Sequence, residues 1–228
     1  MKSIYIISDV HGSYKTLLAL IDKLPDKENS KICFVGDLVD RGSDSFLVIK
    51  YIMDNNLDCV LGNHELMFLK YAPLLKNDRQ NRALAQWLFK NGGEETIKSY
   101  KNEEEFYSQL EFIKSLPLYK EYKDIKTQDG RYLVVSHSCV GKVWKLRDSK
   151  NKEEIEAFEN HVLWSRYMNF DNKDIFNVYG HTIVSEPDIA DYYADIDLGC
   201  YNKDKIPNPR LCALEFPSMK VFTQRNIE

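Results

Sequence analysis

Residues 31–42 read KICFVGDLVDRG, and this stretch decides the fold. Its first half is a short apolar run of the kind that forms a buried strand. The glycine that ends the run is followed at once by Asp37, and Asp40 and Arg41 come within the next few residues. In open α/β sheets, ligands bind beyond the carboxyl ends of the strands, so charged side chains at this point indicate a functional site.

Similar apolar runs and helical patterns alternate on both sides of this stretch. Strands are predicted over residues 3–8, 31–35 and 58–61, which are rich in branched and aromatic residues. Helices are predicted over residues 14–24 and 45–56, where apolar residues recur with helical spacing. This β-α-β-α-β order predicts parallel strands joined by crossover helices.

The pattern changes at about Leu118. Residues 63–116 predict several helices, with a break at Pro73 and a helix end and restart in NGGEET, residues 91–96. After Leu118 the pattern predicts strands, which we expect to form a second sheet in the same domain. These strands lie in residues 118–125, 131–137, 176–180, 193–199 and 210–216, with a closing strand in 220–224.

Composition limits the classes of function. The chain has 228 residues, a formal net charge of −4 and five cysteines. This favours one domain spanning residues 1–228, with reduced thiols, in the cytoplasm. The first apolar run is too short for a signal peptide or a membrane span, so we expect no membrane partner. The negative charge gives no general attraction to nucleic acid.

Metal-capable side chains follow five of the predicted strands. Taken singly, each such residue is more often a strand-end cap, but their recurrence favours a common site. Gly36, Gly62 and Gly180 would let the backbone turn sharply and bring these side chains together. Ligands of this kind without thiolates favour Mn, Fe or Zn, and their number suits two ions that share a carboxylate. The residues are Asp9, His11, Asp37, Asn63, His137 and His181.

Five motifs occur in a fixed order along the chain: SDVHG (8–12), GDLVDRG (36–42), GNHE (62–65), His137 and GHT (180–182). Together they resemble the PPP-type metallophosphoesterases, and among these the small bacterial and phage serine/threonine protein phosphatases of the bacteriophage lambda type. The resemblance covers about the whole length. It implies a calcineurin-like metallophosphoesterase domain, an α/β fold in which a two-sheet β-sandwich is flanked by helices in four αββα layers.

The resemblance also implies which residues hold the metals. One divalent ion would bind Asp9, His11 and Asp37, and the other Asp37, Asn63, His137 and His181. Asp37 is then the bridge, which suits a carboxylate with two oxygens. A hydroxide held between the ions would attack phosphorus directly. Manganese is the expected ion, with iron and zinc as alternatives.

The remaining site residues follow from the same resemblance. His64 would protonate the leaving oxygen, and Asp40 would hold its other ring nitrogen. Arg41 and Arg166, the latter in LWSRY (163–167), would bind the substrate phosphate, where a planar guanidinium fits well. An ordinary surface arginine is an equally good interpretation of Arg166.

Three functions stay open on the sequence. The leading hypothesis is a phosphomonoesterase acting on phosphoserine or phosphothreonine in proteins. The first alternative is a symmetrical dinucleoside tetraphosphate hydrolase or another nucleotide pyrophosphohydrolase, with RNA 5′ ends also open. Asp40 and the glutamate of GNHE favour the phosphatase, since the tetraphosphate hydrolases usually lack this aspartate and have GNHD. A non-catalytic metal-bound scaffold is the second alternative, and the intact His64, Asp40 and Arg41 argue against it.

Three further positions have two interpretations each. Leu61 stands where many protein phosphatases of this family have an arginine, so one phosphate contact is expected to be missing. Trp87 could line the substrate groove, but a core position is favoured because leucines flank it with helical spacing. Tyr201 lies in the loop CYNKDKIPNP (200–209), where related phosphatases carry a substrate-facing loop, although an ordinary loop tyrosine is favoured. The oligomeric state is left open.

Overall fold

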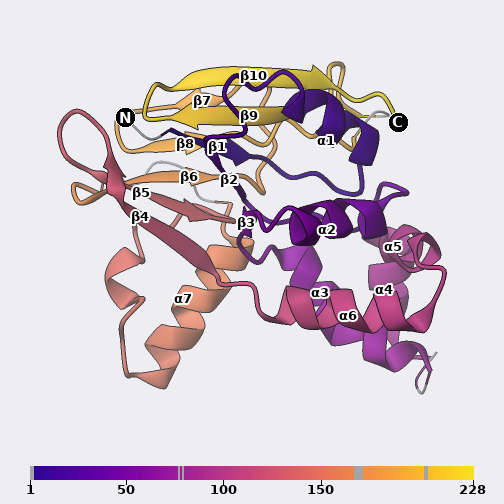
Figure 1. Cartoon of the computed structure of the whole chain (residues 1–228). Helices are drawn as coiled ribbons and strands as arrows, with labels where there is room; N and C mark the ends of the chain where they lie inside the picture. Colours follow the sequence, from indigo (N-terminus) through magenta and orange to yellow (C-terminus); the bar gives the residue numbers. More distant parts are fainter. Residues whose placement is uncertain (1–2, 77, 79, 167–171, 203–204) are drawn as a thin grey trace.

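Two five-stranded sheets pack face to face in the computed structural model, which describes residues 3–76, 78, 80–166, 172–202 and 205–228 (Figure 1). The first sheet has the strand order β10-β9-β1-β2-β3, and the second has the order β4-β5-β6-β8-β7. The strands of the first sheet are β1 (Ile4–Ile7), β2 (Lys31–Phe34), β3 (Asp58–Cys59), β9 (Arg210–Phe216) and β10 (Lys220–Arg225). Those of the second are β4 (Tyr119–Lys126), β5 (Tyr132–Ser136), β6 (Ile175–Tyr179), β7 (Asp188–Ile189) and β8 (Tyr193–Asp195).

The parallel pairing predicted for the first half of the chain is confirmed. β1 pairs with β2 and β2 with β3, both in parallel, with Ile6 opposite Cys33. The crossover helices α1 (Tyr14–Ile21) and α2 (Ser45–Asp54) connect these strands. The carboxyl ends of all three strands therefore lie at the same edge of the sheet.

The prediction for the last two strands was wrong. β9 and β10 do not belong to the second sheet, because β9 lies antiparallel beside β1, with Ile6 opposite Leu214 (Figure 1). β1 is buried on both faces, so its backbone groups need a partner strand on each side. The end of the chain supplies the second partner.

Side chains that alternate along β1 place the hydrophobic core in layers. Ile4 and Ile6 lie in the cluster between the two sheets, together with Leu133 and Val135 of β5. Tyr5 and Ile7 face the other way, into the cluster formed with the helices on the outer side of the first sheet. The predicted four-layer αββα arrangement is therefore confirmed.

The outer helices fall into two groups. Those beside the first sheet, besides α1 and α2, are α3 (Asn63–Tyr71), α4 (Arg82–Lys90), α5 (Gly93–Ser99) and α6 (Glu103–Lys114), with the short 3₁₀ helix η1 (Ala72–Leu75). The helix break at Pro73 and the restart after Asn91 agree with the sequence prediction. The second sheet is covered by α7 (Lys152–Trp164), near the 3₁₀ helix η2 (Trp144–Leu146).

Helix α7 was not predicted from the sequence. The helix begins after Asn151, whose side chain accepts hydrogen bonds from the N–H groups of Glu153 and Glu154. Only a narrow stripe is apolar, since Phe158 and Val162 pack on the second sheet while most of the other residues are exposed. The asparagine cap followed by glutamates was the available signal.

Two further findings concern the whole described chain. All five cysteines are buried, and none of them forms a disulfide. In the described ranges, no helix combines the length and the apolar character needed to cross a bilayer.

Candidate metal centre

The predicted site residues meet at the carboxyl ends of strands from both sheets. All six predicted ligands are buried, with at most 7 % of the side chain exposed. Asp9 and His11 follow β1, Asp37 follows β2, Asn63 begins α3 after β3, His137 follows β5, and His181 follows β6. The first and second sheets thus contribute side chains to one cavity of about 240 Å³.

The loops that carry these residues adopt unusual backbone conformations. Positive φ angles occur at His11 (45°), Asp37 (48°), Asp40 (70°), Arg41 (71°) and His181 (71°). Non-glycine residues are uncommon in this left-handed region, and such conformations cluster at functional sites where the surrounding structure enforces them. The strained backbone conformations therefore occur at residues that were predicted from the sequence to form the site.

Hydrogen bonds between the loops enforce these conformations. The carbonyl oxygen of Asp37 accepts from the N–H groups of Val10 (3.0 Å) and His11 (2.9 Å), which ties the loop after β2 to the loop after β1. Two of the three glycines singled out in the sequence are required by the close approach of site residues. A Cβ atom on Gly62 would collide with Asp37, and one on Gly180 would collide with Asp9.

Glu65 holds the loop after β2 from the other side. Its buried carboxylate accepts hydrogen bonds from the N–H groups of Asp37 (2.7 Å), Leu38 (2.7 Å), Val39 (3.1 Å) and Gly62 (3.0 Å). Glu65 therefore fixes the backbone around Asp37 and has no part in the cavity lining. The glutamate of GNHE is a structural residue here.

We expect Glu65→Gln to destabilise the fold, because the amide nitrogen would face backbone N–H groups that now donate to a carboxylate. A buried donor without an acceptor costs about 1–3 kcal/mol, so the free energy of unfolding should fall by at least that amount. Urea denaturation measures it. Glu111→Gln is the matched control, since Glu111 forms only an exposed ion pair with Lys114 and such pairs contribute roughly 0–1 kcal/mol. An equal loss in both variants would contradict the role of Glu65.

Asp37 lies between two groups of metal-capable atoms. One group consists of His11, Asp37 and His64, and the other of Asp37, His137 and His181; within each, the candidate ligand atoms lie within 4.8 Å of one another. Asp37 Oδ2 is 3.5 Å from His11 Nε2, and Asp37 Oδ1 is 3.4 Å from His137 Nε2. Each carboxylate oxygen thus faces a different histidine, as a bridging ligand requires.

The positions of the protons on the His11 and His137 rings are those that a bound cation requires. His11 Nδ1 lies 2.8 Å from the carbonyl oxygen of Val39, and His137 Nδ1 lies 2.9 Å from that of Val35. A ring nitrogen that contacts a carbonyl oxygen carries the proton, so the Nε2 atom of each histidine presents a lone pair. These lone pairs face oxygen atoms of Asp37, and this arrangement is repulsive unless a cation lies between them.

Burial keeps these imidazoles neutral, the form that binds metal. It lowers the pKa of His11 and His137, and burial together with the neighbouring His137 lowers the pKa of His181 to about 3. His181 Nε2 is buried and has no hydrogen-bond partner among the described residues. Asn63 Oδ1 lies 2.8 Å from His137 Nε2 and 3.1 Å from His181 Nδ1, which completes the second group.

Buried carboxylates crowd the same cavity. Burial and the charges of Asp197 and Asp37 raise the pKa of Asp9 well above its usual value. Four histidines outweigh the effect of burial on Asp37 and hold its pKa below the usual range. Asp9 lies outside the two close groups, and its oxygens accept from the N–H of His181. The excess of negative charge also fits bound cations.

Asp197 is a cavity residue that the sequence analysis missed. It follows β8 and lines the cavity with Asp9 and Asp37. Burial raises its pKa to about 7, with the hydrogen bond from the N–H of Gly199 opposing this effect and the charge of Asp37 adding to it. The sequence prediction placed Asp197 inside a strand over residues 193–199, whereas β8 ends at Asp195, so Asp197 was not recognised as a polar residue at a strand end.

His64 and Asp40 form the hydrogen-bonded pair that the sequence predicted. His64 Nδ1 donates to Asp40 Oδ2 at 2.7 Å, and Nε2 accepts from Arg41 Nη2 at 3.1 Å. Asp40 also accepts from Trp87 Nε1 (2.9 Å) and Thr96 Oγ1 (2.7 Å), which fix its orientation. Burial lowers the pKa of His64, but Asp37 and Asp40 outweigh it, so that the pKa is raised.

Both predicted phosphate-binding arginines lie in the cavity lining. The guanidinium of Arg41 lies over the ring of Tyr201, with its central carbon 4.3 Å from the ring centroid, and Tyr201 packs edge-on against His11. Tyr201 is therefore part of the cavity. Arg166 Nη1 donates to the carbonyl oxygen of His181 at 3.4 Å. Leu61 lies apart from the cavity lining and packs against the outer core cluster.

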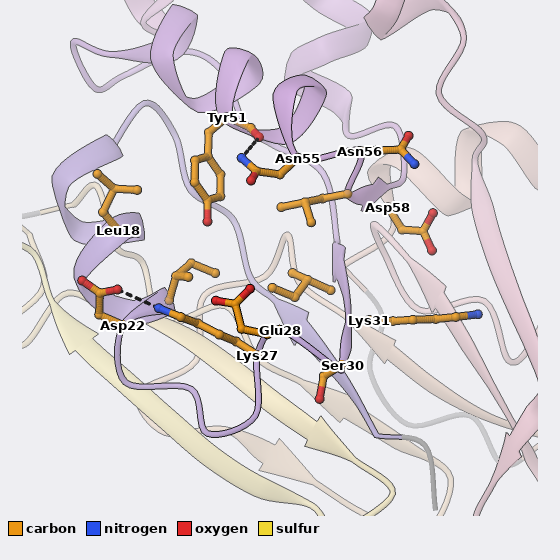
Figure 2. A pocket seen from close by; sticks show the side chains of 13 residues that line it. Leu18, Asp22, Lys27, Glu28, Ser30, Lys31, Tyr51, Asn55, Asn56 and Asp58 are labelled. Atoms are coloured by element: carbon orange, nitrogen blue, oxygen red, sulfur yellow. Dashed lines mark hydrogen bonds and ion pairs between the residues drawn. The ribbon is translucent and has the colours of Figure 1, made fainter.

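A larger cavity, of about 680 Å³, lies at the opposite ends of the strands (Figure 2). Figure 2 shows Lys27 paired with Asp22, and Asp58 of the same lining is paired with Lys120. These charges are satisfied within the chain and do not converge on a common point. The predicted metal ligands gather instead at the smaller cavity at the carboxyl ends.

Several curated proteins are similar in sequence. The symmetrical bis(5′-nucleosyl)-tetraphosphatase of Photorhabdus laumondii is 28% identical over 172 residues, covering 73% of this chain and 55% of that protein. The asymmetrical bis(5′-nucleosyl)-tetraphosphatase PrpE of Oceanobacillus iheyensis is 27% identical over 245 residues, covering 94% of this chain and 90% of that protein. The chain spans little more than half the length of the symmetrical relatives that it matches.

These relatives contradict the leading hypothesis of a protein serine/threonine phosphatase of the lambda type. They bear the names of nucleotide hydrolases and support the alternative instead. Neither of the two residues that favoured the phosphatase distinguishes one substrate from the other. Glu65 supports a loop, and Asp40 orients a histidine that hydrolysis of either phosphoester could use.

Solved structures are similar in fold, and a family model shows the family. A candidate diadenosine tetraphosphatase superposes with a TM-score of 0.69 at 19% identity, covering all of this chain and 95% of that chain. A serine/threonine protein phosphatase of Saccharomyces cerevisiae superposes with a TM-score of 0.58 at 15% identity, covering all of this chain and 81% of that chain, so the two branches share the fold. The model of the calcineurin-like phosphoesterases matches residues 2–210. The chain belongs to the calcineurin-like phosphoesterase family.

Proposed function

We propose that this chain, one domain over residues 1–228, hydrolyses dinucleoside polyphosphates such as diadenosine tetraphosphate with the help of two divalent cations. One observation carries the proposal: Asp37 is shared by two metal-capable groups in a cavity that also contains the His64–Asp40 pair. The names of the relatives support a nucleotide as the substrate.

Each ligand has a place in this proposal. Asp9, His11 and Asp37 hold one cation, and Asp37, Asn63, His137 and His181 hold the other. Cations so placed lower the pKa of water and neutralise charge on a phosphoryl group, and manganese is the ion we expect. The backbone carbonyls of Val39 and Val35 keep the Nε2 atoms of His11 and His137 free for this purpose.

The remaining residues act on the substrate. Arg41 and Arg166 bind the phosphate chain from the cavity wall. His64, oriented by Asp40, gives a proton to the leaving phosphate oxygen as the bond to phosphorus breaks. For this step Arg41 turns from His64 Nε2, to which it now donates, toward the substrate, and Nε2 takes up the proton that it then gives; the raised pKa of His64 favours this protonated form.

The function is tested with chain that has been stripped of metal and reloaded with Mn, Zn, Fe or Mg. We expect diadenosine tetraphosphate to be cleaved only after reloading, and best with Mn. Chromatography of the products shows the bond that is cleaved: ADP alone means symmetrical cleavage, and ATP with AMP means asymmetrical cleavage. Hydrolysis of an aryl phosphate without any release of nucleotide from diadenosine tetraphosphate would contradict the proposal.

A further inference from the structure

A second hollow opens beside the metal-site cavity. It has a volume of about 370 Å³ and lies between α3, α4 and α7. Three residues, Met67, Asn91 and Trp164, line both hollows. The two are therefore adjoining parts of one surface, and a molecule bound at the metal site can extend into the second part, which we name the α3–α7 groove.

The groove presents an aromatic wall and amide groups. Trp164, the last residue of α7, is 44% exposed, although a side chain of this size is usually well covered. Gln86 and Asn160 supply amides with donors and an acceptor that match the edge of a nucleobase, and Asn91 adds a third amide whose Nδ2 also donates to Met67 Sδ at 3.1 Å. Lys70 is the one charged residue among the described residues that line the groove. The lining suits a flat, largely uncharged group.

The groove runs along α3 from the end where His64 stands, so it lies on the side of the metal site where the leaving group would be protonated. His64 stands in the first turn of α3, and Met67, which lines both hollows, stands one turn later. Lys70 and Tyr71 continue the lining along the same helix. A leaving oxygen protonated by His64 is therefore attached to a group that can follow α3 into the groove.

We infer that the α3–α7 groove binds the nucleoside of the leaving nucleotide, with the base stacked on Trp164 and its edge bonded to the nearby amides. A volume of about 370 Å³ is within the range of ligand pockets, roughly 300–1,000 Å³. Base stacking tolerates any base, so the groove selects nucleotides over simple phosphates without selecting one base. The inference rests on the proposed function, because it takes the substrate to be a nucleotide.

The test measures binding of AMP and of inorganic phosphate to the Mn-loaded chain by titration calorimetry. We expect AMP to bind more tightly than phosphate. Trp164→Ala should weaken AMP binding by roughly 5- to 150-fold, the effect of removing a base-stacking aromatic, and should weaken phosphate binding far less. Trp164→Phe should restore most of the affinity for AMP.

Two further variants distinguish a loss of binding in the groove from a general disturbance of the fold. Ala83→Phe fills the groove at an exposed position that does not line the metal-site cavity, and it should weaken AMP binding selectively. Phe89→Ala removes an aromatic that is 66% exposed on α4 and lines neither hollow, and it should change nothing.

Equal weakening of AMP and phosphate in Trp164→Ala, or AMP binding no tighter than phosphate in the unaltered chain, would overturn the inference. So would an Ala83→Phe variant that keeps its full affinity for AMP. Because the binding test needs no turnover, its result is independent of whether diadenosine tetraphosphate is cleaved. Failure of that cleavage counts against the proposed function alone.

Discussion

Asp37→Asn is expected to abolish hydrolysis of diadenosine tetraphosphate. Asp37 is the one residue common to both metal-capable groups, so its replacement weakens two cation sites at once. An amide carries no charge and has one ligand oxygen, and it cannot bridge two cations as a carboxylate does. Stabilisation of the transition state by such cations is worth several kcal/mol, so kcat/KM should fall by roughly 10³-fold or more.

The Asp37→Asn variant should still fold. Its φ angle of 48° lies in the left-handed region, which asparagine adopts as readily as aspartate. Elemental analysis of the dialysed protein should find two cations per chain before the substitution and fewer than one after it. Asp54→Asn is the matched control, since Asp54 is exposed at the end of α2 and forms an ion pair with Lys50. Two tightly retained cations in Asp37→Asn would rule out the bridge.

His64→Asn is the second substitution with a large expected effect. Loss of a general acid lowers kcat by roughly 10² to 10⁴, and we expect this range with both cations retained. Retention is expected because the six proposed ligands are untouched, and because the two ring nitrogens of His64 already pair with Asp40 and Arg41. Steady-state kinetics and metal content together measure the effect.

The dependence of the rate on the leaving group distinguishes a general acid from a metal ligand. A general acid matters less as the leaving group becomes a better one, so the defect of His64→Asn should shrink along a series of aryl phosphates with increasingly acidic phenols. Asp40→Asn should show a weaker form of the same trend, since it leaves His64 without its charged partner. A defect that is constant along the series, or is accompanied by loss of a cation, would make His64 a metal ligand instead.

The parallel half of the fold was predictable because its signals are local. Each strand of the β1-β2-β3 unit is a short apolar run, and the helices between them repeat with helical spacing. The pairing of β9 with β1 was not predictable in this way. It joins residues about two hundred positions apart, and nothing in either strand states which sheet edge is free.

The site was predictable for a different reason. Asp9, Asp37 and His181 are far apart in the chain, yet one topological rule places the ends of their strands together. Applied to the observed end of β8, the same rule identifies Asp197, which lay inside the strand predicted over residues 193–199. For Trp87 the sequence predicted only part of the role. The side chain is fully buried, as its spacing predicted, but its hydrogen bond to Asp40 could not be predicted from the sequence.

The substrate was the part that sequence reasoning placed wrongly. Asp40 and Glu65 were interpreted as signs of a protein phosphatase. In the structure, Asp40 is hydrogen-bonded to His64 and Glu65 holds the backbone at Asp37, and both contacts would serve the hydrolysis of either substrate. Discrimination between substrates depends on surfaces outside the motifs, such as the α3–α7 groove. Those surfaces are assembled from residues on separate helices and carry no motif of their own.

One comparison tests the central claim most directly: kcat/KM for diadenosine tetraphosphate against kcat/KM for a phosphoserine peptide, measured on the same Mn-loaded preparation. We predict that the dinucleotide has the higher value and that stripping the metal removes both activities. A peptide value equal to or above that of the dinucleotide would contradict the account.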